Sequence, residues 1–222
     1  PLSSSPDPST SERHLTATVA GRSPALTHIP TRTEPQFTKR DLVAFAKGDP
    51  VQCFGPDFAP YRHRHLPRIP NGELLLMDRV IQVEGEPWAL DGGATLRSEY
   101  DVAPGAWFYV GGLYPGLPPH TALMEMALQP CGFLSAYLRS PLLGPPGDLH
   151  FRNLDGEGRL LADLDLRGKT VTNDVRLISS VRGQGVILQT FTFALSCEGV
   201  PFYEGESSFG YFPPEALRDR VD

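Results

Sequence analysis

Hydrophobic residues are densest between Pro119 and Leu138, where the chain reads PHTALMEMALQPCGFLSAYL. Apolar residues occupy nearly every face of the helix that this stretch predicts, and such a helix must be buried. Within it stands a single carboxylate, Glu125. Because a buried carboxylate is costly unless it is paired or used, the function of this segment depends on what Glu125 contacts.

Apolar and β-branched runs on both sides of this helix predict strands. Two runs precede it, Leu74–Val83 and Trp88–Val102, and the Leu-rich start of the first also fits a short helical entry. Ala106–Val110 has the pattern of a strand end. Four further runs follow, separated by turn signals at Gly168, 183–185 and 198–199: Leu160–Arg167, Val171–Val181, Val186–Cys197 and Pro201–Phe212.

The remaining segments divide the chain into four parts. The first 35 residues hold six Ser, six Thr and six Pro. This predicts a disordered linker over 1–36, either natural or left by excision from a longer protein. Residues 37–73 are predicted to form a helix, capped by Thr38 with Asp41 and ended by Gly48, and then an extended arm over Val51–Pro70. Residues 74–212 make the main domain, and 213–222 begin a C-terminal linker.

The order of these elements indicates an α+β fold. Strands come first, then one long apolar helix, then successive antiparallel strands. A helix this apolar needs a sheet on most sides, so we expect a single hot-dog fold, an antiparallel sheet wrapped around one central helix. A lipocalin-like barrel fits less well, because its helix does not lie inside the sheet.

Composition limits the classes of partner. The net charge is −6 and the pI about 5.5, with no basic run, which argues against nucleic acid and anionic membrane surfaces. The three cysteines match no metal spacing and are typical of reduced thiols in a cytoplasmic protein. No run approaches the roughly 20 apolar residues of a membrane span, and the start lacks a signal-peptide core. We expect small molecules or other proteins as partners.

A polar stripe crosses the predicted helix. Spacings of four, four and three place Thr121, Glu125, Gln129 and Gly132 on one side. In one interpretation Glu125 and Gln129 satisfy backbone groups at a subunit or domain seam. In the other, Glu125 faces a substrate tunnel as an acid or base, with Thr121 and Gln129 as binding residues. Pro130 removes one helical hydrogen bond and predicts a kink near Met126.

The start of the helix offers further candidates. His120 is a possible catalytic partner, although five residues place it about 140° from Glu125 around a helix. Gly111, Gly112 and Gly116 permit close approach of the preceding loop to a ligand, and free N–H groups near Thr121 could hold a thioester carbonyl. The alternative is that these glycines only shape a tight turn. The sequence has no G-x-S-x-G elbow, metal cluster or phosphate loop.

Several phrases carry a resemblance to a known family. They are CFGPDFAPY (Cys53–Tyr61), AWFYV (Ala106–Val110), ALMEMALQPCGFLSAYL (Ala122–Leu138), DLHFRNLDG (Asp148–Gly156), DLRGKTV (Asp165–Val171) and FGYF (Phe209–Phe212). With them the chain from about Phe37 to Phe212 resembles the hot-dog dehydratase-type domains of polyunsaturated fatty acid synthases. It is more distantly similar to the β-hydroxyacyl thioester dehydratases of bacterial fatty acid synthesis.

The resemblance implies a site with one departure. In those dehydratases a His in a loop reading roughly H-F-x-G-x-P-x-M-P-G removes the α-proton, and a carboxylate on the helix assists loss of water. Glu125 matches that carboxylate. Alignment of Tyr114-Pro115-Gly116 puts Leu113 at the His position, and a shifted gap offers Gly111 or Gly112. None of these side chains can accept a proton, so the chain resembles the His-lacking member of a hot-dog pair.

The resemblance therefore implies dehydration of 3-hydroxyacyl groups to trans-2-enoyl thioesters in a multidomain synthase, with this domain as a degenerate structural half. It implies no cofactor beyond the phosphopantetheine of acyl carrier protein, which holds the substrate. The implied partners are that carrier protein and either an adjacent hot-dog domain or a second copy. Two alternatives stay open: a hot-dog thioesterase that uses Glu125, and a non-catalytic module that docks the carrier protein.

Overall fold

The computed structural model describes residues 34–64, 67–88, 92–110, 116–144 and 147–220. The predicted linker 1–36 therefore lies almost wholly outside the described residues. In chain order the elements are α1 (Lys39–Lys47), α2 (Pro50–Phe54), η1 (Pro56–His63), η2 (Gly72–Leu74), β1 (Arg79–Glu84), β2 (Thr95–Asp101), η3 (Trp107–Tyr109), α3 (His120–Tyr137), η4 (Ser140–Leu143), β3 (His150–Leu160), β4 (Thr170–Gly183), β5 (Val186–Cys197), β6 (Val200–Phe212) and η5 (Pro214–Arg220).

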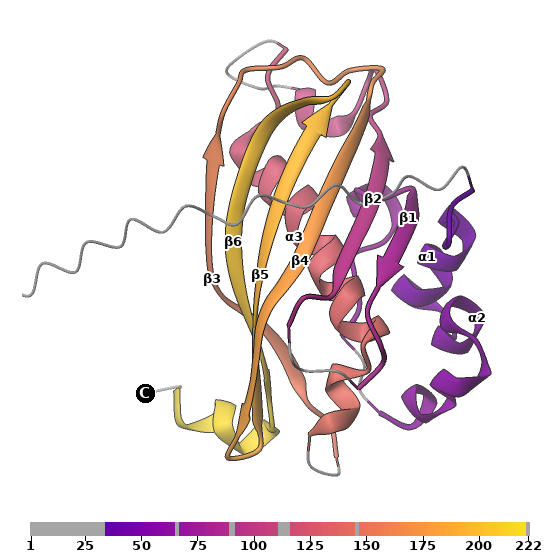
Figure 1. Cartoon of the computed structure of the whole chain (residues 1–222), viewed down its shortest axis with the longest axis vertical. Helices are drawn as coiled ribbons and strands as arrows, with labels where there is room; N and C mark the ends of the chain where they lie inside the picture. The colour runs from indigo at the N-terminus through magenta and orange to yellow at the C-terminus, as the bar shows by residue number, and fades with distance from the viewer. Residues whose placement is uncertain (1–33, 65–66, 89–91, 111–115, 145–146, 221–222) are drawn as a thin grey trace, which may run out of the picture.

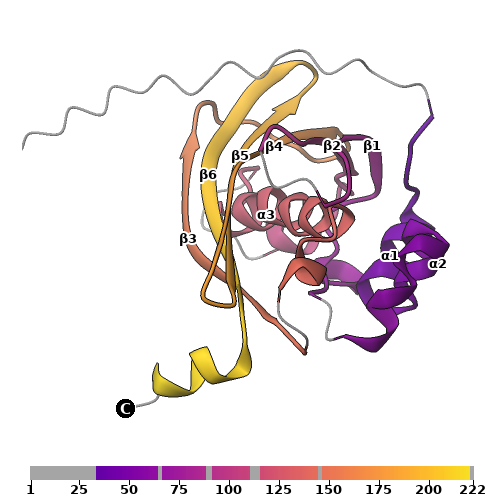
Figure 2. The same cartoon turned by 60° about the horizontal axis from the view of Figure 1, so that its bottom comes forward.

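The sheet wraps around one helix, as the sequence predicted. Its six strands run in the order β1-β2-β4-β5-β6-β3, and all neighbours are antiparallel. The sheet curves, and α3 lies along its concave side (Figures 1 and 2). The architecture is a single hot-dog fold of the α+β class. The predicted central helix, from Pro119 to Leu138, differs from α3 by one residue at each end.

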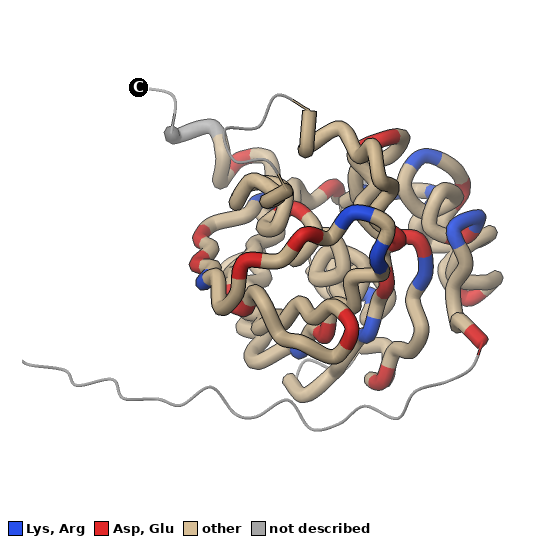
Figure 3. The backbone as a smooth tube through the Cα atoms, turned by 90° about the horizontal axis from the view of Figure 1, so that it is seen from above, with Lys and Arg blue, Asp and Glu red and all other residues tan. Residues whose placement is uncertain are grey.

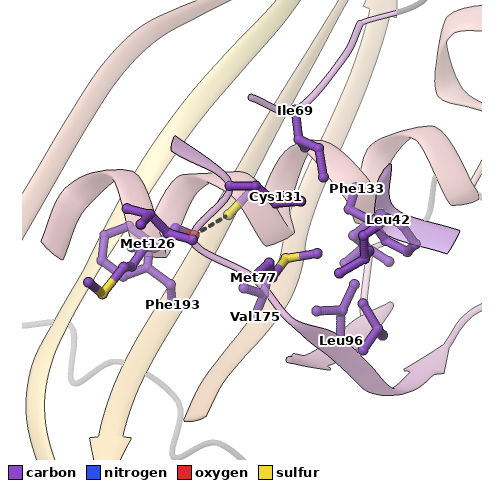
Figure 4. Packing of buried hydrophobic residues seen from close by; sticks show 14 of the residues in the cluster. Leu42, Ile69, Met77, Leu96, Met126, Cys131, Phe133, Val175 and Phe193 are labelled. Atoms are coloured by element: carbon purple, nitrogen blue, oxygen red, sulfur yellow. Dashed lines mark hydrogen bonds between the residues drawn. The ribbon is translucent and has the colours of Figure 1, made fainter. Parts of the chain in front are cut away.

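The core forms where α3 meets the sheet. Met126, Cys131 and Phe133 on the helix are at most 2% exposed, and they pack with Val175 and Phe193 of the sheet in one cluster (Figure 4). All three cysteines are free and buried. Burial raises the pKa of the Cys131 thiol, so this side chain behaves as a small apolar group.

The segment before the sheet is helical and not an extended arm. Helix α1 begins as predicted, with Thr38 N–H donating to Asp41 Oδ2 over 2.8 Å. The extended arm predicted over Val51–Pro70 is wrong as far as His63, because α2 and η1 form there. The reason is aromatic spacing: Phe54, Phe58 and Tyr61 recur at helical intervals and pack on one another and on α3. Figure 1 places α1 and α2 beside the β1 edge of the sheet.

The strand predicted over Leu160–Arg167 is also wrong. The strand that precedes β4 is β3, which ends at Leu160. It lies at the edge of the sheet and pairs with β6 alone among the described strands. Most of its side chains are exposed on both faces, so its sequence shows no alternation of apolar and polar residues.

Other boundaries shift for local reasons. Over the described residues the first two strands are shorter than predicted, because Leu75, Leu76 and Met77 have no strand partner and Trp88 adopts φ 73°. Residues 89–91 of the second predicted strand lie outside the described residues. The strand end predicted at Ala106–Val110 is wrong: a single 3-10 turn, η3, stands there. The C-terminal segment begins with η5, also a 3-10 helix.

Pro130 is accommodated inside α3 by a residue of the sheet. Proline has no N–H, so the carbonyl of Met126 loses its usual helical donor. Asn173 of β4 replaces it: its Nδ2 donates to the Met126 carbonyl over 3.0 Å and to that of Ala127 over 3.3 Å. The helix therefore continues through the proline without an unsatisfied carbonyl at this turn.

Charged residues of both signs are mixed over the chain. Figure 3 shows Lys and Arg beside Asp and Glu along the backbone and no separation by sign. Paired examples on the sheet are Arg79 with Glu99 and Arg97 with Asp174.

Candidate functional site

One side of α3 is not covered by the described residues. Thr121 is exposed, and Met124, Glu125 and Leu128 are half-buried, whereas most of the later residues of the helix are buried. The predicted polar stripe therefore opens to the surface at its N-terminal end. Gly132, at its other end, is buried beside Ile69.

Glu125 is held by Gln129, one helical turn further on. Gln129 Nε2 donates to Glu125 Oε1 over 2.9 Å. Within the described chain, Glu125 Oε2 makes no hydrogen bond, which leaves this oxygen available at the open end of the stripe. A carboxylate fixed on one oxygen and free on the other is suited to proton transfer.

Gln129 is itself anchored to the backbone. Its Nε2 also donates to the Leu74 carbonyl over 2.7 Å, and its Oε1 accepts from the Leu76 N–H over 2.9 Å. The residue is only 3% exposed. Both ends of the side chain are thus engaged within the protein, and the observed role of Gln129 is to hold Glu125 and the segment before β1.

His120 has a different neighbour. Its Nε2 lies 3.3 Å from Tyr203 Oη of β6, and the two rings meet edge to face with centroids 5.4 Å apart. Burial raises the pKa of the Tyr203 phenol, so its hydroxyl keeps its proton and can donate to a neutral imidazole. The structure therefore groups His120 with Tyr203, and Glu125 with Gln129, in two separate pairs.

A glycine of β3 leaves the space that Tyr203 occupies. Gly158 of β3 and Gly205 of β6 are directly paired across the strands. A Cβ at Gly158 would overlap the Tyr203 hydroxyl, and one at Gly205 would overlap the Glu157 carbonyl and the Phe193 ring. The absence of a side chain at Gly158 allows the Tyr203 phenol to reach the first turn of α3.

The loop before α3 is described only in part. Gly111, Gly112 and Leu113, the three positions that align with the expected His, lie outside the described residues. Gly116 is described: it adopts φ +87°, which favours glycine, beside the Asp165–Arg167 ion pair. The Arg167 guanidinium lowers the pKa of Asp165 to about 2.

Neither a metal cluster nor a membrane-spanning helix is found within the described residues. No three His, Cys, Asp or Glu side chains are grouped closely enough there to hold a metal ion. Among the helices in the same ranges, none combines the length and apolar content that a membrane crossing requires.

A sequence relative of this chain is known. No family model matches the chain. It is 36% identical over 189 residues to a polyunsaturated fatty acid synthase subunit of Thraustochytrium sp., a match that covers 80% of this chain and 12% of the relative. The chain is a hot-dog domain of the polyunsaturated fatty acid synthase type. It spans about an eighth of the length of that relative.

Solved structures with lower similarity were also found. The dehydratase heterocomplex ApeI:P from Xenorhabdus doucetiae gives a TM-score of 0.46 at 18% identity, over 66% of this chain and 88% of that one. A hot-dog-like protein from Thermanaerovibrio acidaminovorans gives 0.44 at 17% identity, over 60% and 90% of the two chains.

Three features of this synthase hot-dog domain were missed from the sequence. They are Tyr203 beside His120, the Leu74–Leu76 backbone beside Gln129, and Asn173 beside Pro130. Tyr203 and Asn173 stand in strands more than 40 residues from their partners, and no local pattern connects them. The spacing of four between Glu125 and Gln129 did predict that these two side chains share a face.

Proposed function

We propose that this domain takes part in the dehydration of 3-hydroxyacyl groups carried on the phosphopantetheine of acyl carrier protein, as the degenerate half of a hot-dog pair. The observation that carries the proposal is the state of Glu125: Oε1 is fixed by Gln129, and Oε2 has no partner among the described residues. The sequence match to a polyunsaturated fatty acid synthase subunit supports the class of reaction.

In the proposed step three bonds break, C2–H, C3–O and the O–H of the Glu125 carboxyl, and three form: the C2–C3 π bond, the bond from the base to its proton, and the new O–H bond of water. A base takes the proton from C2 of the 3-hydroxyacyl thioester, the C2–C3 double bond forms, and the hydroxyl at C3 leaves as water. The protonated Glu125 carboxyl donates the proton that converts the departing hydroxyl to water. This chain has Leu113 or glycine at the aligned position of the base, so we propose that the neighbouring hot dog supplies it.

The edge strand β3 supports the pairing. It is 11 residues long and pairs with β6 alone among the described strands. Leu154 and Leu160 are 44% and 48% exposed. A long exposed edge is a ready template for another strand. We therefore propose that a second hot dog, either the adjacent domain of the synthase or another copy, binds along β3.

The test is a turnover assay with a 3-hydroxyacyl pantetheine thioester, followed by mass spectrometry. The chain is assayed alone and mixed with the adjacent hot-dog domain of its synthase. We expect enoyl product only from the mixture, and loss of at least about 100-fold in rate with Glu125→Gln. Glu86→Gln changes an exposed carboxylate outside α3 and should leave the rate unchanged.

Other products would identify the alternatives. Release of free acid that depends on Glu125 would indicate a thioesterase. Enoyl product from the chain alone would show a complete site and refute the degenerate half. Binding of acyl carrier protein without any product, even in the mixture, would leave a docking module.

A further inference from the structure

The extended segment between η2 and β1 is held by side chains from two helices. Gln129 of α3 binds the Leu74 carbonyl and the Leu76 N–H. From the other side, Lys39 Nζ of α1 donates to the carbonyls of Leu75 and Met77 over 3.3 and 2.9 Å. Successive residues of the segment thus direct their backbone groups in turn toward α3 and toward α1, as a strand inside a sheet does toward its two neighbours.

This arrangement satisfies backbone groups that have no strand partner. Leu75, Leu76 and Met77 are 1–3% exposed, and pairing with β2 begins only at Asp78. Buried backbone groups without partners are costly, so each helix supplies what a neighbouring strand would otherwise provide. The Lys39 ammonium also forms an ion pair with Asp78 Oδ1 at 2.7 Å, and this ion pair holds the ammonium beside the end of the segment.

We propose that Lys39 is a positioning residue for Glu125, so that the N-terminal helix is part of the functional site. Lys39 fixes the Leu75–Met77 backbone, this backbone fixes the Gln129 amide, and Gln129 fixes Glu125 Oε1. The importance of this route for turnover depends on the proposed function, whereas the route itself does not.

The three hydrogen bonds of the Gln129 side chain explain how movement of the segment would affect Glu125. Gln129 Nε2 divides its two hydrogens between the Leu74 carbonyl and Glu125, and Oε1 accepts from Leu76. When the segment moves away, Gln129 loses two of its three bonds and its amide is free to rotate. Glu125 then loses the donor that orients it.

Hydrogen exchange of the Leu76 amide in the 222-residue chain measures this directly, because its acceptor is Gln129 Oε1. The variant is Lys39→Met, which keeps the apolar stem and removes the ammonium. Its matched control is Arg40→Met, an exposed neighbour on α1 with no hydrogen bond in the described chain. The Leu177 amide, bonded to the Ala94 carbonyl over 2.8 Å, reports on the sheet.

We expect Lys39→Met to lower the protection of Leu76 about tenfold and to leave Leu177 unchanged. The side-chain NH2 resonances of Gln129 should shift in the same variant, Lys39→Arg should restore both signals, and Arg40→Met should alter neither. Unchanged Leu76 protection, or an equal loss at Leu177, would overturn the proposal.

Turnover in the mixed-domain assay separates this inference from the function. A lower rate in Lys39→Met, restored by Lys39→Arg, supports positioning of a working Glu125. If Glu125→Gln leaves turnover intact, the proposed function fails, and Leu76 exchange still decides the role of Lys39.

Discussion

Gln129 and Glu125 are joined by a hydrogen bond in which Gln129 Nε2 donates to Glu125 Oε1 over 2.9 Å. The same nitrogen donates to the backbone of Leu74. The orientation of the one carboxylate on α3 therefore depends on a segment about 50 residues earlier in the chain.

Gln129→Leu should lower the free energy of unfolding by about 2–3 kcal/mol, because it leaves the buried Leu76 N–H and the Leu74 carbonyl without their partner. Glu125→Gln should cost less than about 1 kcal/mol, since Glu125 is half-buried and the new amide can still accept from Gln129. Urea denaturation of the two variants measures both values. Equal losses would contradict the assignment of Gln129 as the structural member of the pair.

Asn173 and Pro130 should be energetically coupled. Asn173→Leu removes the donor to the Met126 carbonyl and should cost about 1–2 kcal/mol while Pro130 is present. In a Pro130→Ala background the new backbone N–H can bond to Met126, so the same substitution should cost much less. A double-mutant cycle should give a coupling energy of about 1 kcal/mol or more. Additive effects would show that Asn173 does not replace the proline's missing donor.

Gly158→Ala should destabilise the domain by about 1–3 kcal/mol through overpacking, because the added Cβ overlaps the Tyr203 hydroxyl. Gly183→Ala is the matched control: it also lies in a strand, but nothing stands within 4 Å of its added Cβ. This control should stay within about 0.5 kcal/mol of the parent. Thermal unfolding followed by circular dichroism compares the two. The prediction fails if Gly158→Ala is as stable as its control.

Stability should fall in alkali because of Tyr211. This phenol is 0% exposed and contacts Ser135 Oγ at 2.5 Å, and burial raises its pKa above the ordinary value near 10. The unfolded chain then releases the proton first. The stabilising contribution is fully present below about pH 10 and is lost as the pH rises toward the folded-state pKa.

The expected slope from this phenol is about 1.4 kcal/mol per pH unit above pH 10. Urea denaturation at a series of pH values measures it, and Tyr211→Phe should make the alkaline limb shallower. Tyr61 is also buried and stays in both proteins, and the burial that is the main cause of its raised pKa is common to both. Identical alkaline limbs would show that Tyr211 is not the group responsible.

Much of the fold followed from local pattern. The helix around Glu125 was predicted within one residue at each end, because its apolar content and its Pro and Gly boundaries are local signals. Strands β4, β5 and β6 were predicted with small shifts, since each alternates or is densely apolar between clear turns. Edge strand β3 was not predicted: exposure on both faces removes the alternation by which a strand is recognised.

Local sequence pattern was enough to predict which helix is central, that a sheet surrounds it, and that Glu125 and Gln129 share a face, because these properties depend on spacing within one element. Three contacts became known from the folded chain: Gln129 binds Leu74 and Leu76, His120 lies against Tyr203, and Asn173 replaces the donor that Pro130 lacks. Each of these contacts joins residues far apart in the chain. Their geometry depends on how the sheet curves around the helix, which no local pattern encodes.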